Sequence, residues 1–169
     1  ISDCDKCCEA DPCISVEKNL LNYCIKTVEN QKHLAATYEI VFTNRNKHCV
    51  THLTCIDTLF GASDCEWACV QLCHVKAVTC DDNLEVSCEN DLKRGKLLKD
   101  CSSLPACSVS RLIVTIKVKF DEDMQKASVR NSITVNGKLK KHKCSKYDSG
   151  ILPIYVLTDA IDVNGIIVA

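Results

Sequence analysis

Cysteine content constrains this chain more than any other feature: fifteen of its 169 residues are cysteine, and fourteen of these lie within residues 1–107. Such a density is typical of extracellular proteins in which disulfides support a small core. Zinc clusters usually repeat the C-x-x-C pair, which occurs here only at Cys4 and Cys7. The composition therefore predicts a secreted, extracellular, disulfide-bonded protein.

The odd number of cysteines leaves one without an intramolecular partner if the other fourteen pair. Cys144 is the natural candidate because it is the only cysteine after residue 107 and lies in a lysine-rich stretch. We expect it to be a free thiol or to form an intermolecular disulfide, which would give a covalent homodimer. The alternative is that Cys144 joins the two parts of the chain and the odd cysteine lies elsewhere.

The first part of the chain, residues 1–107, has apolar residues at every fourth position, a spacing typical of amphipathic helices. Only residues 35–43 alternate in this part, which predicts a single strand. The expected helices cover 15–31, 47–60, the segment holding Cys65, Cys69, Cys73 and Cys80, and 84–98.

The second part, residues 108–169, has the alternation of β-strands, most clearly at 112–120. Asn136-Gly137 is a strong hairpin signal. Further strands are expected at 132–135, 153–158 and 166–168. The sequence therefore predicts an α+β fold, in which a disulfide-stapled helical part (1–107) packs on an antiparallel β-meander (108–169) and shares one core with it.

Two histidines are candidate metal ligands. His48 and His52 would lie one turn apart on the expected 47–60 helix, a spacing that suits zinc or copper. The glutamate of the H-E-x-x-H motif is missing, so zinc-dependent hydrolysis is not implied. The alternative is two surface histidines, and no other cofactor is expected.

A basic run in the second part is a candidate anion-binding site. It would suit an acidic polysaccharide or an acidic protein partner, whereas the lack of an interleaved aromatic residue argues against nucleic acid. The alternative is a solvated edge strand that resists aggregation. The residues of the run are Lys138, Lys140, Lys141, His142, Lys143 and Lys146.

No catalytic motif and no apolar run long enough for a transmembrane helix is present in the sequence. We therefore expect a non-enzymatic protein that binds a partner or builds an extracellular structure, and that self-associates. One alternative is a protease inhibitor or toxin-like effector, which would present Arg45 or the loop Cys101–Cys107 containing Leu104. Another is binding of glycosaminoglycans through Lys138–Lys146.

Overall fold

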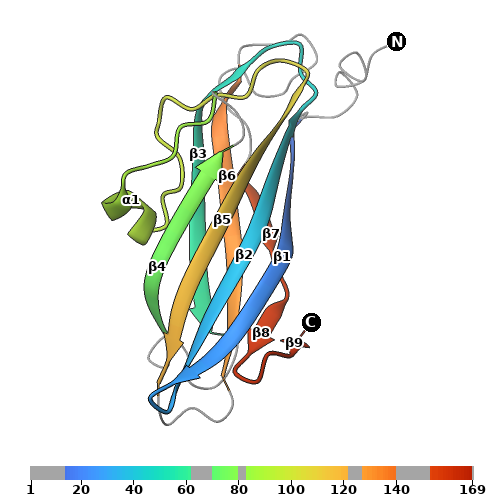
Figure 1. Cartoon of the computed structure of the whole chain (residues 1–169). Coiled ribbons are helices and arrows are strands. Elements are labelled where there is room, and N and C mark those ends of the chain that lie inside the picture. The colour runs from blue at the N-terminus through green and yellow to red at the C-terminus, as the bar shows by residue number, and fades with distance from the viewer. Residues whose placement is uncertain (1–13, 62–69, 80–82, 122–126, 140–152, 169) are drawn as a thin grey trace.

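The computed structural model describes residues 14–61, 70–79, 83–121, 127–139 and 153–168. Within these ranges the chain forms two antiparallel sheets that face each other as a sandwich, with one short helix at the side (Figure 1). The helix, α1, covers only Glu89–Lys93. The predicted α+β fold, a helical part packed on a β-meander, is therefore wrong: the described chain is almost entirely β structure, and β5 lies in a different sheet from β6 to β9.

The two sheets draw their strands from both parts of the sequence. The first sheet has the order β1-β2-β5-β4, in which the strands are Ile14–Val28, Gln31–Asn44, Ser108–Phe120 and Val70–Thr79. The second sheet has the order β3-β6-β8-β9, with β7 also paired to β6. Its strands β3, β6, β7, β8 and β9 are Val50–Gly61, Ser128–Leu139, Ile154–Leu157, Ala160–Asp162 and Ile167–Val168.

The strand β1 shows why a spacing of four misled the sequence analysis. Residues four apart share a face in a helix, but they also share a face in a strand, where the period is two. A register shift between Leu20 and Asn22 then breaks the alternation that would have revealed the strand. Glu29 and Asn30, both with positive φ, form the two-residue turn to β2.

The predictions of the other helices are also wrong. Residues 47–60 contribute the strand β3, and residues 84–98 contain only the short helix α1. Of the segment with four stacked cysteines, only Cys73 lies in the described residues, where it is exposed at a register shift of β4.

The strands expected at 35–43, 112–120 and 153–158 are confirmed by β2, β5 and β7. The hairpin expected at Asn136-Gly137 is wrong, because β6 continues through both residues. Gly137 lies against Val50, whose Cγ1 atom would be only 2.6 Å from the Cβ of any larger residue at this position. This glycine therefore permits close packing beside the irregular start of β3.

The core lies between the two sheets and is densest at the central strands β2 and β5. Their inward side chains are almost completely buried, and β6 supplies the facing layer. The largest of these buried side chains are Leu34, Tyr38, Ile40, Phe42, Leu112, Ile116, Phe120 and Ile133.

The connection between β4 and β5 covers the side of the sandwich where β3 and β4 lie. Its backbone follows the free edge of β3, with hydrogen bonds from Asp57 N to Gly95 O, Leu97 N to Cys55 O and Leu53 N to Ser102 O. The helix α1 at its start packs against β4. This covering segment, residues 83–107, frames the site described next.

Candidate functional site

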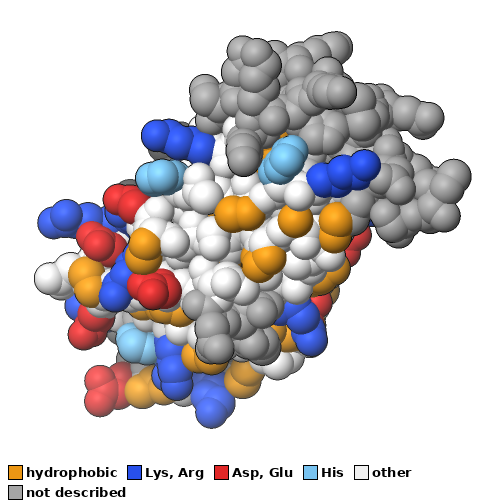
Figure 2. All heavy atoms as spheres, turned by 90° about the horizontal axis from the view of Figure 1, so that it is seen from above, with side chains coloured by type: hydrophobic (Ala, Val, Ile, Leu, Met, Phe, Trp, Pro, Cys, Tyr) orange, Lys and Arg blue, Asp and Glu red, His pale blue; other side chains and the backbone are white. Residues whose placement is uncertain are grey.

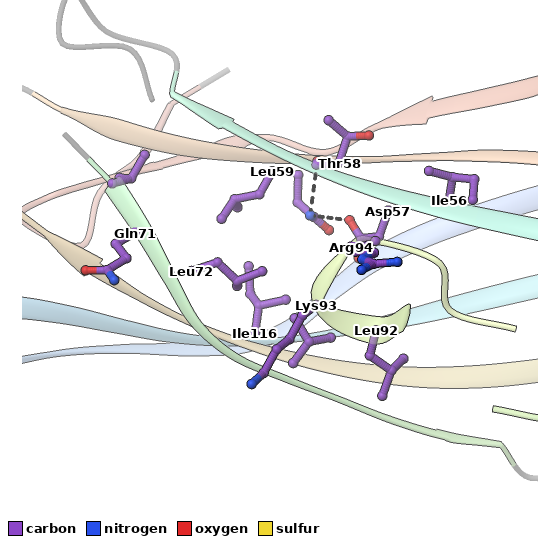
Figure 3. Close-up of a pocket in the computed structure, with 14 residues that line it drawn as sticks. Ile56, Asp57, Thr58, Leu59, Gln71, Leu72, Leu92, Lys93, Arg94 and Ile116 are labelled. Carbon is purple, nitrogen blue, oxygen red and sulfur yellow. Dashed lines mark hydrogen bonds between the residues drawn. The ribbon is translucent and has the colours of Figure 1, made fainter. Parts of the chain in front are cut away.

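A cavity of about 500 Å³ opens between β3 and β4, beside α1 (Figure 3). Seven of its fourteen lining residues have apolar side chains, six are polar or charged, and the remaining one is Gly95. Exposed Gln71, Lys93 and Arg94 line its solvent side. The full lining consists of Ile56, Asp57, Thr58, Leu59, Val70, Gln71, Leu72, Val75, Leu92, Lys93, Arg94, Gly95, Ile116 and Asn131.

Gly95 holds the rim of this cavity against β3. Its φ of 91° favours glycine, and a Cβ at this position would lie 2.2 Å from the carbonyl oxygen of Asp57. The absence of a side chain lets the carbonyl of Gly95 accept the 2.6 Å hydrogen bond from Asp57 N. Gly95 therefore fixes the backbone that carries the one carboxyl group of the cavity wall.

That carboxyl belongs to a buried polar cluster between the two sheets. Lys18 of β1, whose side chain is fully buried, lies 3.4 Å from Asp57 Oδ1 and also donates to Asn131 Oδ1. The Asn131 amide donates to Asp57 Oδ1 and, at 3.3 Å, to the Thr58 carbonyl, as the dashed lines in Figure 3 mark. The Lys18 ammonium also lies 4.8 Å from the centre of the Tyr38 ring.

Burial controls the protonation of this cluster. It raises the pKa of Asp57, although Lys18 and the Asn131 hydrogen bond act in the opposite direction. Burial likewise lowers the pKa of Lys18 against the attraction of Asp57. The buried Cys55 thiol beside them has its pKa raised by the same loss of solvent. The low-dielectric interior therefore weakens the preference of each group for its charged form.

One carboxyl oxygen of Asp57 accepts no hydrogen bond from the described residues. Its Oδ2 is buried and has no hydrogen-bond partner among the residues that the structure describes, whereas Oδ1 has two. A buried acceptor without a partner is rare in folded proteins and calls for an explanation. The oxygen itself is inaccessible to solvent, so a molecule in the open cavity does not reach it.

The charged side chains on the surface around α1 are of both signs. Seen from above, this side of the molecule shows interleaved basic and acidic side chains (Figure 2). Lys93 pairs with Glu89 at 3.8 Å and Lys96 with Asp100 at 3.1 Å. Charge alone therefore does not select an anionic or a cationic ligand at the cavity entrance.

The two histidines predicted to bind metal are not held on a helix. His48 lies before β3, and His52 lies within β3 at a register shift, with a φ of 52°. In the described residues, no group of three or more potential ligands is arranged to hold a metal ion. A zinc or copper site at His48 and His52 stays a prediction, without the helical turn that motivated it.

Most of the predicted anion-binding run lies outside the described residues, as does Cys144. Only Lys138 is described, and its side chain is exposed on β6. The expectations for Lys140, Lys141, His142, Lys143 and Lys146, and for a covalent dimer through Cys144, therefore stay predictions.

The described cysteines include free thiols. Cys55 is buried, and the other free cysteines are exposed, while Cys107 is disulfide-bonded. The free cysteines in the described ranges are Cys24, Cys49, Cys55, Cys73, Cys88 and Cys101.

The loop Cys101–Cys107, proposed for protease inhibition, is held against the rest of the protein by hydrogen bonds around Leu104. Leu104 is fully buried and exchanges backbone hydrogen bonds with Val50. The buried Asn44 amide donates to the carbonyls of Leu104 and Pro105, at 3.1 and 3.0 Å. These contacts keep the Leu104 side chain away from any protease, whereas Arg45 is exposed.

Sequence reasoning missed Lys18, Asp57 and Asn131. A signal was available in each case, because each charged or amide residue occupies an inward position of a strand. Lys18 lies on the same face of β1 as Val16 and Leu20, and Asp57 is flanked two residues away by buried positions of β3. Recognising a buried polar residue requires the strand to be identified first, and β1 and β3 were expected to be helical.

Comparisons with known proteins assign no family to this chain. No protein-family model matches the chain, and no curated protein sequence matches it. A solved structure of AvmM, described as catalysing macrocyclization in alchivemycin A biosynthesis, aligns with a TM-score of 0.41 and 9% identity over 87% of this chain and 88% of that one. This likeness is too distant to support an argument about function. In the described residues, no helix is long and apolar enough to cross a membrane.

Proposed function

We propose that this protein is a non-enzymatic binding protein that holds a small, largely apolar molecule in the cavity between β3 and β4. The observation that carries the proposal is the cavity itself, an open hollow of about 500 Å³ whose wall combines apolar side chains with six polar or charged residues. Ligand sites in proteins have this size and this composition. A secreted carrier is the role that agrees with the expectation from cysteine content.

The chemistry of the wall favours binding over catalysis. Among the described residues, the polar side chains that line the cavity are one carboxyl, two carboxamides, the Thr58 hydroxyl and the basic groups of Lys93 and Arg94, with no histidine, cysteine, serine or tyrosine. A catalytic site normally combines a nucleophile or an acid–base pair with groups that stabilise developing charge. The groups present can orient a ligand, and the apolar wall can remove it from water.

Filling the cavity tests the proposal. We expect Leu72→Trp, on the inner face of β4, to weaken binding of the apolar probe N-phenyl-1-naphthylamine at least tenfold, because the indole occupies the space of the probe. Val78→Trp is the matched control, since Val78 lies on the same strand and is exposed. Binding would be measured by calorimetry.

Two results would overturn the proposal. Absence of probe binding to the unmodified protein would remove the ligand site. Equal affinity of Leu72→Trp and the unmodified protein would show that the probe binds elsewhere.

A further inference from the structure

We infer that Lys18 and Asn131 react with each other to form an amide bond between their side chains, and that Asp57 transfers the protons of this reaction. The bond joins β1 in the first sheet to β6 in the second sheet and releases ammonia. Each chain reacts once and modifies only itself, so the protein stays non-enzymatic. The inference does not depend on the ligand proposed for the cavity.

The three reacting side chains contact one another in pairs. The Lys18 amine donates a hydrogen bond to Asn131 Oδ1, which places Nζ beside Cγ, the carbon bonded to that oxygen. Asp57 Oδ1 accepts hydrogen bonds from Lys18 Nζ, at 3.4 Å, and from Asn131 Nδ2. One carboxyl oxygen therefore lies next to the nitrogen that attacks and next to the nitrogen that leaves. Holding reacting groups in such a geometry greatly increases the rate of the reaction between them.

Burial prepares the amine and the carboxyl for the reaction. The Lys18 side chain is fully buried, the Asp57 side chain is 7% exposed, and Asn131 is also buried. This burial lowers the pKa of Lys18 and raises the pKa of Asp57, which favours the neutral amine and the protonated carboxyl relative to the same groups in water. Only the neutral amine has a lone pair that can attack a carbonyl carbon. The ion pair, and any stability that it provides, belongs to chains in which the bond has not formed.

The reaction balances with the three side chains alone. The lone pair of Lys18 Nζ attacks Asn131 Cγ, and the electrons of the C=O double bond move onto Oδ1. Asp57 gives its proton to Nδ2 and takes one proton from Nζ, so the carboxyl ends as it began. The C=O double bond then forms again, the bond from Cγ to Nδ2 breaks, and Nδ2 leaves as ammonia. An amine and a primary amide have become a secondary amide and NH₃.

The position of the cluster suits both the release of ammonia and a structural role for the bond. Asp57 and Asn131 line the open cavity, which lies beside the reacting groups and gives ammonia a route to solvent. The joined residues are 113 positions apart in the sequence and lie in different sheets. A covalent link between such distant residues restricts the unfolded chain, as a disulfide does.

The intact mass of the folded protein tests the inference. Its cysteines are first reduced and alkylated completely, so that disulfides do not change the mass. We expect a mass about 17 Da below that of the sequence, which corresponds to the loss of one ammonia in a covalent self-modification. Tandem mass spectrometry of a tryptic digest should then identify one peptide in which a segment of β1 and a segment of β6 are joined through Lys18 and Asn131.

Two variants and one internal control sharpen the test. Lys18→Met removes the attacking amine, and Asp57→Asn keeps the shape of the carboxyl but cannot carry its proton, so we expect both variants to have their full sequence mass. Lys32 Nζ donates to Asn164 Oδ1 at 3.1 Å, an exposed contact between the same two residue types, and no joined peptide is expected from this pair. If Asp57→Asn does not fold, the joined peptide of the unmodified protein still decides whether the bond forms.

Three results would overturn the inference. A full sequence mass for the folded, unmodified protein would show that the bond does not form. A loss of mass that Lys18→Met retains would show that ammonia leaves from another position. A joined peptide that Asp57→Asn yields as completely as the unmodified protein would remove the role of Asp57. The binding of N-phenyl-1-naphthylamine is measured separately, so the failure of either proposal leaves the other in place.

Discussion

The central strands and the edge strands of this sandwich differ in regularity, and the cavity borders two of the irregular edge strands. β2 and β5 pair from His33 and Lys119 to Asn44 and Ser108 without a register shift. The strands β1, β3 and β4, each at or next to the edge of a sheet, all contain one. The cavity lies between β3 and β4, and in β4 the register shift falls within the stretch that lines it, whereas the shift in β3 lies before the lining residues.

The physical reason lies in packing. An uninterrupted ladder presents side chains in strict alternation, so that every second side chain faces the opposite sheet. A register shift turns the strand locally and changes which residues face inward. In β4, the shift after Leu72 separates two inward side chains, Leu72 and Val75, and both line the cavity.

Breaking the buried ion pair should have the largest effect. Lys18→Met leaves the Asp57 carboxyl buried without its cation, and we expect a loss of about 3–5 kcal/mol in the free energy of unfolding at pH 7. The double variant Lys18→Met, Asp57→Leu should recover much of this loss. Urea denaturation would measure both.

The same pair predicts a pH dependence. Because the pKa of Asp57 is raised on folding, the folded state binds its proton more tightly, and stability falls as pH rises through that pKa. Removal of Lys18 takes away a cause that lowers this pKa. The deficit of Lys18→Met should therefore be smaller at pH 4 than at pH 7, and an equal deficit would contradict the assignment.

Matched truncations compare the two regions directly. Leu112→Ala in β5 removes a fully buried side chain, and we expect it to cost about 3 kcal/mol. Leu72→Ala in β4 should cost about 1 kcal/mol, because its side chain borders an existing cavity and is only partly buried. Equal losses in chemical denaturation would show that the cavity wall is packed as tightly as the centre.

Alanine substitutions at two glycines with positive φ test how closely the covering segment approaches β3. Gly95→Ala should cost about 2–3 kcal/mol and weaken probe binding, because the new methyl group meets the Asp57 carbonyl. Gly165→Ala is the control, with a similar φ of 84° but no atom closer than 3.9 Å to its Cβ, and should cost about 1 kcal/mol. Similar thermal shifts for the two variants would exclude the close approach as the cause.

The smallest effects should come from the exposed thiols. Cys73→Ser, at the register shift of β4, should change stability by less than about 0.5 kcal/mol. Cys55→Ser, on the inner face of β3, should cost about 2 kcal/mol, because the hydroxyl is buried. A large loss for Cys73→Ser in thermal unfolding would show that the edge is less tolerant than its exposure suggests.

Sequence alone predicted the regular strands and failed at the irregular ones. The alternation of Leu112, Val114 and Ile116 survives in β5 because no shift interrupts it. In β1, the shift after Leu20 moves the inward positions to Tyr23 and Ile25, and the interrupted pattern satisfies a helical period.

The meeting of the candidate site residues in space could not be predicted, for a different reason. Lys18, Asp57 and Asn131 lie far apart in the sequence and meet only because β1 faces β3 and β6 across the core. Motif searches detect neighbours along the chain, whereas this cluster depends on the pairing of two sheets. The cysteine count, in contrast, contained no information about where the cavity lies.

The interleaved order of the strands also has a consequence for the synthesis of the chain. The β1–β2 hairpin can form as soon as its turn at Glu29 and Asn30 leaves the ribosome. The strands β2 and β4 must wait for β5 between them, and β3 must wait for β6, which ends at Leu139. Unpaired strand edges are therefore exposed for most of translation, so the nascent chain has a long interval in which it depends on protection from aggregation.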